Sequence, residues 1–183
     1  MDYRILVNKT NSISKDFKPD YLVNAQSKYK DDILLEEETL HSFRKLQEEA
    51  LQFGYQIDIM SGYRSFDYQD KIYNDLVKEK GFNYALRAIA KPGCSEHQTG
   101  LAIDFCVYDN DKCYVEHEIL NFPATKWVHS NCHKYGFIVR YPMDKEEITS
   151  YNYEPWHLRY VGDLAVYLYN NDKTLEEYYL EKE

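Results

Sequence analysis

Apolar residues recur at helical spacing in the second quarter of the chain. Between residues 37 and 53, leucine and phenylalanine alternate with charged residues at roughly the period of a helix, and Gly54 follows where a helix commonly ends. This pattern predicts an amphipathic helix. Comparable patterns, bounded by proline or glycine, predict four further helices at 67–80, 84–90, 123–135 and 162–169.

Short apolar runs between these helices predict strands. They cover residues 57–60, 101–108, 113–115, 137–141 and 156–160. The turn-forming residues 109–111 indicate a hairpin between the second and third of them. The order of elements predicts an α+β fold with a central antiparallel sheet flanked by helices. Because the 183 residues contain no repeat and no long linker, we expect a single domain over residues 1–183.

Two histidines and an aspartate form a candidate metal site. His97 and Asp104 are separated by a segment that contains Gly100, which allows a tight turn between loop and strand, and His157 lies further along the chain. A hydrolytic zinc site uses three protein ligands and leaves one position open for water. Taken singly, each residue more often has a structural role, as a hydrogen-bonded histidine or a turn-capping aspartate. Taken together they predict a metal centre.

Two further polar residues suit catalysis at such a centre. Glu154 stands three residues before His157, with Pro155 between them, and its carboxylate could take a proton from water. Arg64 follows a predicted strand, where its guanidinium could polarise a carbonyl group or stabilise an oxyanion. The structural alternatives are a solvated surface acid for Glu154 and a surface salt bridge for Arg64.

Four motifs cover a core of about residues 57–162. They are S-G-Y-R (61–64), P-G-C-S-E-H-Q-T-G-L-A-I-D (92–104), Y-G-F-I-V-R-Y-P (135–142) and E-P-W-H-L-R-Y-V-G (154–162). Together they resemble the D-alanyl-D-alanine carboxypeptidases and dipeptidases of the VanY, VanX and VanXY type. The flanks at residues 6–9 and 174–178 are similar to the bifunctional VanXY branch, which is cytoplasmic and associated with vancomycin resistance.

The resemblance implies a role for each matching residue. It implies one Zn²⁺ ion held by His97, Asp104 and His157, with Glu154 as catalytic base and Arg64 as the carbonyl or oxyanion contact. The implied substrate contacts are Gln69, Ser95, Tyr141 and Ser61. Some VanXY enzymes carry an acid where this chain has Ser61, so its motif is nearer to the carboxypeptidase form, and the balance between dipeptidase and carboxypeptidase activity stays open.

The expected activity is hydrolysis of the terminal D-Ala of D-Ala-D-Ala or of peptidoglycan precursor peptides, with an implied role in glycopeptide resistance. The alternatives are a phage-type endopeptidase that cuts between L-Ala and D-Glu, and a non-catalytic zinc-containing binding module. The formal net charge of -9 argues against nucleic acid as a partner. The first thirty residues contain no continuous apolar run, so we expect no signal peptide or membrane span, a cytoplasmic location and four cysteines present as thiols.

Overall fold

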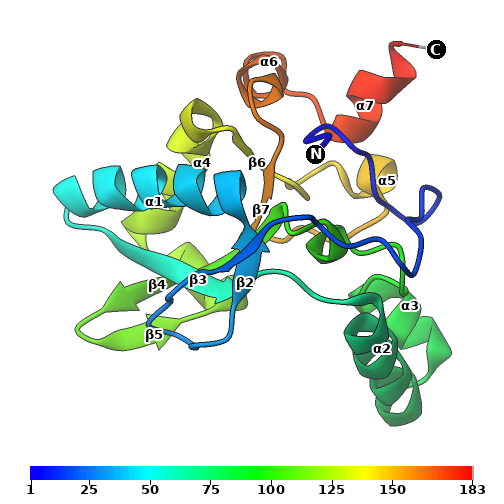
Figure 1. Cartoon of the computed structure of the whole chain (residues 1–183). Coiled ribbons are helices and arrows are strands. Elements are labelled where there is room, and N and C mark those ends of the chain that lie inside the picture. The colour runs from blue at the N-terminus through cyan, green and yellow to red at the C-terminus, as the bar shows by residue number, and fades with distance from the viewer. Residues whose placement is uncertain (183) are drawn as a thin grey trace.

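The computed structural model describes residues 1–182 and has an antiparallel sheet at its centre (Figure 1). Its strands are β3 (Gln56–Ser61), β4 (Ala102–Asp109), β5 (Lys112–Tyr114), β6 (Phe137–Val139) and β7 (His157–Tyr160). They are ordered β3-β4-β7-β6, with β5 paired to β4, and every pairing is antiparallel. A separate two-stranded sheet consists of β1 (Leu22–Asn24) and β2 (Leu34–Glu36).

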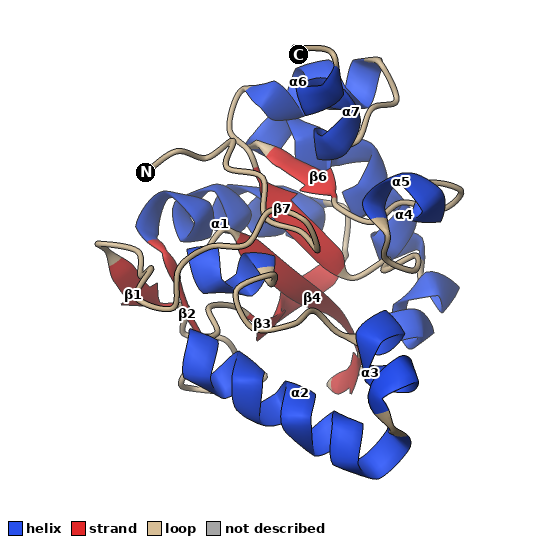
Figure 2. Cartoon of the chain, turned by 90° about the vertical axis from the view of Figure 1, so that its right-hand side faces the viewer, coloured by secondary structure: helices blue, strands red, loops and turns tan. Residues whose placement is uncertain are grey.

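Helices surround the sheet, which confirms the predicted α+β class. The α-helices are α1 (Glu37–Gln52), α2 (Phe66–Lys80), α3 (Phe82–Ala88), α4 (Pro123–Asn131), α5 (Glu146–Thr149), α6 (Leu164–Asn170) and α7 (Leu175–Leu180). Three 3₁₀ turns are η1 (Glu96–Thr99), η2 (Glu116–Asn121) and η3 (Cys132–Tyr135). Helices α2 and α3 form a pair at one side of the body (Figure 2). None of the helices within residues 1–182 is both long and apolar enough to cross a bilayer.

Side chains alternate along the strands, so that one face of the sheet is apolar and the other carries polar groups. In β4, Ile103, Phe105 and Val107 belong to the hydrophobic core, together with Phe43 and Leu46 of α1. Because successive side chains of a strand point to opposite faces, Asp104 is directed away from that core. The sheet therefore uses one face for packing and leaves the other for polar groups.

Local capping explains where the helix-forming segments begin and end. The Glu36 carboxylate accepts a hydrogen bond from the backbone N–H of Thr39 (2.8 Å) and so caps the start of α1. At the other end of α1, Gly54 follows the last turn with a left-handed φ of +79°. The hydroxyl of Ser65 caps α2 in the same way by accepting from the N–H of Tyr68 (3.2 Å). These two helices confirm the sequence prediction within a residue or two.

Several predicted bounds differ from the structure. The strand expected at 137–141 ends at Val139, although the N–H of Arg140 still donates to the carbonyl of His157 (3.1 Å). The helix expected at 123–135 changes after Asn131 into η3, which ends at Gly136 in a left-handed conformation. The predicted hairpin is confirmed, since Asn110 and Asp111 both have positive φ, as a tight two-residue turn requires.

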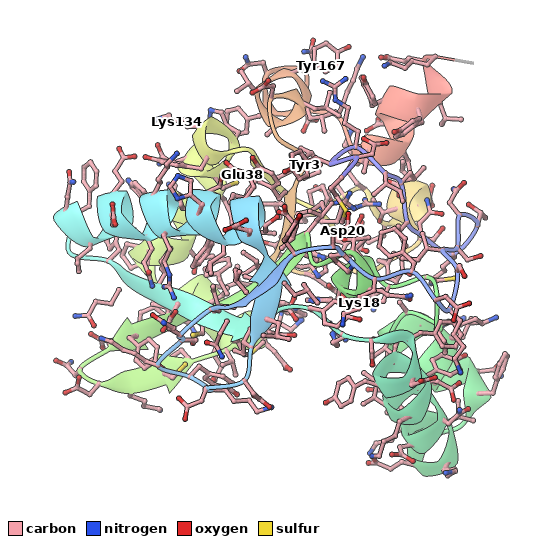
Figure 3. All side chains as sticks on the ribbon, in the orientation of Figure 1. Tyr3, Lys18, Asp20, Glu38, Lys134 and Tyr167 are labelled. Atoms are coloured by element: carbon pink, nitrogen blue, oxygen red, sulfur yellow. The ribbon has the colours of Figure 1, made fainter. Side chains whose placement is uncertain are left out.

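The segment before β1 packs along the body of the protein. The ring of Tyr3, labelled in Figure 3, lies edge-on to Tyr160 of β7 with the ring centroids 5.1 Å apart. Further along, the side-chain amide of Gln98 in η1 donates to the carbonyl of Ser14 (2.9 Å). The N-terminal residues thereby support both the sheet and η1. The four cysteines are unpaired, and three of them are buried.

Candidate metal and active site

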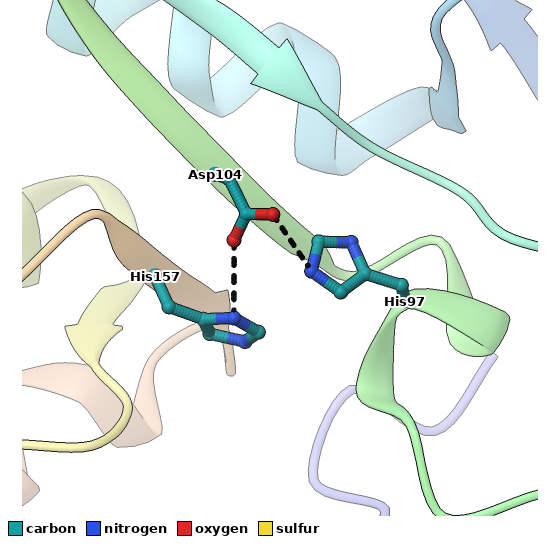
Figure 4. A group of neighbouring side chains, drawn as sticks. All are labelled: His97, Asp104 and His157. Atoms are coloured by element: carbon teal, nitrogen blue, oxygen red, sulfur yellow. Dashed lines mark ion pairs between the residues drawn. The ribbon is translucent and has the colours of Figure 1, made fainter. Parts of the chain in front are cut away.

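His97, Asp104 and His157 meet on the polar face of the sheet (Figure 4). Asp104 on β4 and His157 at the start of β7 are directly opposed residues in the antiparallel pairing. His97 reaches them from η1. One ligand atom from each residue lies within 4.8 Å of the other two, and all three residues are buried. The structure thus brings together the three residues singled out in the sequence.

A glycine turn places His97 beside Asp104. Gly100 has φ +70°, in the left-handed region that favours glycine. A Cβ atom there would lie 3.1 Å from the backbone nitrogen of Glu36, whose N–H donates to the carbonyl of Gly100 (3.1 Å). The turn therefore packs directly on β2 and returns the chain from η1 into β4.

Hydrogen bonding identifies the nitrogen atoms available to a metal ion. His97 Nδ1 lies 2.6 Å from the carbonyl oxygen of Gly62, which can only accept, so Nδ1 carries the proton and Nε2 presents its lone pair. His97 Nε2 lies 3.2 Å from Asp104 Oδ2, and His157 Nδ1 lies 3.2 Å from Asp104 Oδ1. Within residues 1–182, His97 Nε2 and Asp104 Oδ1 are buried without a hydrogen-bond partner. This donor set of two imidazoles and a carboxylate fits a Zn²⁺ ion.

Burial and neighbouring charges shift the pKa values of the two histidines in opposite directions. Burial lowers the pKa of His97 to about 4, helped by the nearby charge of Arg64, so this imidazole is neutral near pH 7. Burial also disfavours a charged His157, but the Asp104 and Glu96 carboxylates outweigh it and raise its pKa to about 9. Since a metal ligand must be deprotonated, binding at His157 Nδ1 must release a proton.

Glu154 lies beside this group in the loop before β7. Its Oε2 is 3.5 Å from His157 Nδ1, and its backbone N–H donates to the carbonyl of Tyr141 (3.0 Å). About a fifth of its side chain is exposed to the cleft (21%). Burial raises its pKa to about 7, against the opposing effect of His157. Such a carboxyl group can both accept and return a proton near neutral pH.

Arg64 is fixed on the other side of Asp104. Its Nη2 lies 3.5 Å from Asp104 Oδ2, and its Nη1 donates to Gln69 Oε1 (3.2 Å). The Gln69 amide in turn donates to the carbonyl of Ala90 (2.8 Å). Gln69 was expected to contact substrate, but its side chain is buried and both ends of its amide already have partners. Its contacts hold Arg64 and the segment that follows α3.

The residues lie in a cleft of about 680 Å³, with Arg64 and Glu154 both in its lining. Ser61 is paired with Asp104 across β3 and β4, next to an irregularity in the β3 register. Tyr141 is buried, with its ring 4.9 Å from that of His157. Ser95 is also buried in the cleft wall. All four expected substrate contacts, Ser61, Gln69, Ser95 and Tyr141, therefore line this cleft.

Sequence reasoning missed a group of buried charges that begins in the wall of the cleft. Glu96, which also lines the cleft, interacts with Arg140 and Arg159, and Arg140 also pairs with Glu176 of α7. Both arginines are completely buried. The one available signal was the presence of an arginine inside each of two short apolar strand segments, Y-G-F-I-V-R-Y and H-L-R-Y.

Two curated proteins resemble this chain over most of its length. YodJ of Bacillus subtilis (strain 168) is 41% identical over 181 residues, which cover 95% of this chain and 66% of YodJ. The bifunctional D-Ala-D-Ala dipeptidase and D-Ala-D-Ala carboxypeptidase VanXYC of Enterococcus gallinarum is 37% identical over 178 residues, which cover 95% of this chain and 92% of VanXYC. The chain thus spans slightly under two thirds of YodJ and nearly all of VanXYC.

Solved structures show the same fold. The LD-carboxypeptidase LdcB matches with a TM-score of 0.88 and 41% identity, covering 95% of this chain and 84% of LdcB. The vancomycin-resistance D,D-dipeptidase VanXYg, bound to a D-Ala-D-Ala phosphinate analogue, matches with a TM-score of 0.85 and 33% identity, covering 97% of this chain and 70% of VanXYg. A mutant of the D,D-pentapeptidase VanY in complex with Zn(II) matches with a TM-score of 0.82 and 32% identity, covering 97% of this chain and 99% of that VanY chain.

The family model VanY, D-alanyl-D-alanine carboxypeptidase, matches residues 32–163. This range holds every residue that the sequence singled out for catalysis, substrate contact or metal binding. The resemblance inferred from the four motifs is confirmed. Because the matched range covers most of the chain and the relatives share the fold, this protein belongs to the VanY family of D-alanyl-D-alanine carboxypeptidases and is an enzyme of the carboxypeptidase and dipeptidase type.

Proposed function

We propose that this enzyme is a zinc-dependent D,D-carboxypeptidase and D,D-dipeptidase that hydrolyses the terminal D-Ala of D-Ala-D-Ala or of peptidoglycan precursor peptides. One observation carries the proposal: the His97, Asp104 and His157 ligand atoms converge in a cleft that Glu154 and Arg64 also line. A family relative, VanXYC, is named for both activities. The fit of the donor set to zinc and the position of the two catalytic candidates support the same reaction.

Each residue has a chemical task in this proposal. A Zn²⁺ ion held by His97, Asp104 and His157 would acidify a water molecule and polarise the scissile carbonyl group. Glu154 takes a proton from the attacking water and delivers it to the amine of the departing D-alanine. Arg64 donates to the carbonyl oxygen, on which negative charge develops. Because Asp104 and Gln69 hold the guanidinium in place, little reorganisation is needed during the reaction.

The other cleft residues bind the substrate or support the residues that do. Ser61 and Ser95 carry hydroxyl groups that can hydrogen-bond the substrate backbone or its carboxylate. Tyr141 supplies an apolar ring beside His157. We assign Gln69 an indirect part, through Arg64, because both ends of its amide are already bonded.

A second candidate is an L,D-carboxypeptidase, which removes a D-residue that follows an L-residue. The similarity to the LD-carboxypeptidase LdcB, at 41% identity, favours it as an alternative within the same chemistry. The two activities use the same site and differ in the stereochemistry of the residue before the scissile bond. A phage-type L-Ala-D-Glu endopeptidase remains a third substrate option for the same site.

One substrate panel tests these options. Zinc-loaded protein is incubated separately with D-Ala-D-Ala, D-Ala-D-Ser, D-Ala-D-lactate, a muramyl pentapeptide that ends in D-Ala-D-Ala, and the tetrapeptide that ends in L-Lys-D-Ala. Released products are identified by mass spectrometry. We expect D-alanine from the dipeptide and the pentapeptide. Release from the tetrapeptide alone would replace the D,D assignment with the L,D one, and cleavage within the peptide would point to the endopeptidase.

The proposal extends to the biological role. Removal of D-Ala-D-Ala ends would eliminate the target of glycopeptide antibiotics, and the relative VanXYg is a vancomycin-resistance enzyme. We therefore propose a role in glycopeptide resistance, exerted on precursors in the cytoplasm. Expression in a sensitive strain should raise the inhibitory concentration of vancomycin, and cell fractionation should find the protein with the cytosol.

A further inference from the structure

Glu96 has an asymmetric set of partners. Its carboxylate is completely buried, and Oε1 accepts hydrogen bonds from both Arg140 Nε and Arg159 Nη1, each at 2.7 Å. The other oxygen, Oε2, has no hydrogen bond within residues 1–182 and lies 3.5 Å from His157 Nε2. Two guanidinium groups therefore share one oxygen, while the second oxygen faces the imidazole.

The two arginines are themselves held by other parts of the chain. Arg140 forms a bidentate pair with Glu176 of α7, at 2.9 and 2.6 Å. Arg159 Nη2 donates to the backbone carbonyls of Tyr3 (3.1 Å) and Ile5 (2.7 Å). The position of Glu96 is therefore fixed from both ends of the chain. Glu176, Tyr3 and Ile5 all lie outside residues 32–163, the range that the family model matches.

We propose that Glu96 is the positioning residue for His157. Its Oε2 holds the proton of this imidazole on Nε2 and orients the ring, so that Nδ1 faces Asp104 with its lone pair. The proposal rests on the proposed function, since it assumes that His157 Nδ1 binds the metal ion. Carboxylates that hydrogen-bond the remote nitrogen of a ligating histidine fix its tautomer and raise its basicity.

The geometry favours this role over charge compensation alone. A carboxylate that only neutralised arginine would gain most from a bidentate pair that uses both oxygens, as Glu176 does with Arg140. Glu96 instead leaves Oε2 free toward the histidine. Two carboxylates and two guanidinium groups also balance in charge, so the network presents a carboxylate oxygen to His157 Nε2 without adding net charge to the interior.

A comparison of the variants Glu96→Gln and Glu176→Gln separates the positioning of His157 from charge compensation of the arginines. Both substitutions remove one buried carboxylate from the same network, but only Glu96 faces His157. Zinc affinity of the folded proteins is measured by competition with a chromophoric chelator, after circular dichroism has shown that they are folded. We expect Glu96→Gln to weaken zinc binding about 10- to 100-fold, the usual effect of losing such a partner. Glu176→Gln should stay within about threefold of wild type by the same reasoning.

A readout on the unmodified enzyme keeps the proposal testable if Glu96→Gln does not fold. In ¹H–¹⁵N spectra of the zinc-loaded protein, the Nε2–H proton of His157 should resonate far downfield, as a proton hydrogen-bonded to a carboxylate does. A His157 Nε2–H proton without this downfield shift, or equal zinc affinities in the two variants, would refute the role of Glu96. Failure of the wild-type protein to bind zinc at all would instead refute the proposed function.

Discussion

Asp104 Oδ1 lies 3.2 Å from His157 Nδ1, and the two residues are directly opposed in the register of β4 and β7. Backbone hydrogen bonds of the sheet therefore place this pair, independently of any bound ion. We predict that Asp104→Asn folds but loses zinc affinity by more than about 100-fold, because the loss of an outer partner alone costs 10- to 100-fold. Metal content after dialysis measures the effect, and circular dichroism checks the fold.

Asp58→Asn is the matched control for this prediction. Asp58 is a buried aspartate on the neighbouring strand β3, and it accepts a hydrogen bond from the backbone N–H of Lys28 (2.8 Å). It lies outside the cleft lining. Its variant should keep a full complement of zinc, and normal zinc content in Asp104→Asn as well would show that the ligand assignment is wrong.

The position of Asp104 could be predicted from the sequence because strand alternation is local. A polar residue between Ile103 and Phe105 must point away from the core that they form. The Glu96 network could not be predicted, since Arg140 pairs with a residue 36 positions away and a single sequence does not show which distant charges meet. Strands β1 and β2 were missed because three residues show too little periodicity by themselves; β5 is equally short, but the turn-forming residues 109–111 before it indicated a hairpin.

Glu154→Gln should retain zinc and lose most of the turnover. The amide keeps the shape of the side chain but cannot take up a proton, and general base catalysis contributes roughly 100- to 10,000-fold. Glu154 is not needed for the sheet, because its backbone N–H rather than its side chain bonds to Tyr141. Steady-state rates with D-Ala-D-Ala, measured together with zinc content, give the result. Turnover within threefold of wild type would assign the base to another residue.

Glu177 should make the stability of the protein depend on pH in the acid range. Burial alone would raise its pKa, but bonds from the Thr174 backbone and from Lys145 lower it below the ordinary value of 4.5. Its ionised form is therefore stabilising above pH 4.5, and the contribution is lost as the pH falls through the lower pKa of the folded state. Urea unfolding should show Glu177→Gln less stable than wild type at pH 7, with a difference that shrinks below pH 4.5. A difference that is constant from pH 7 to pH 3 would contradict this assignment.

Recognition of the substrate's free carboxylate should decide whether the enzyme trims ends or cuts within peptides. The cleft offers the hydroxyl groups of Ser61 and Ser95 as donors to this carboxylate, whereas Gln69 is already bonded at both ends of its amide. Hydrogen bonds to a charged group contribute roughly 1.5 to 3 kcal/mol each, so two of them are worth on the order of 100-fold or more in specificity. Amidating the C-terminus of the pentapeptide, or extending it by one residue, should lower kcat/KM by at least that factor. Competition assays with the free acid and the amide in one tube, followed by mass spectrometry, measure the ratio directly. Equal rates for the two peptides would mean that the enzyme does not recognise the terminal carboxylate. The endopeptidase would then be the better assignment.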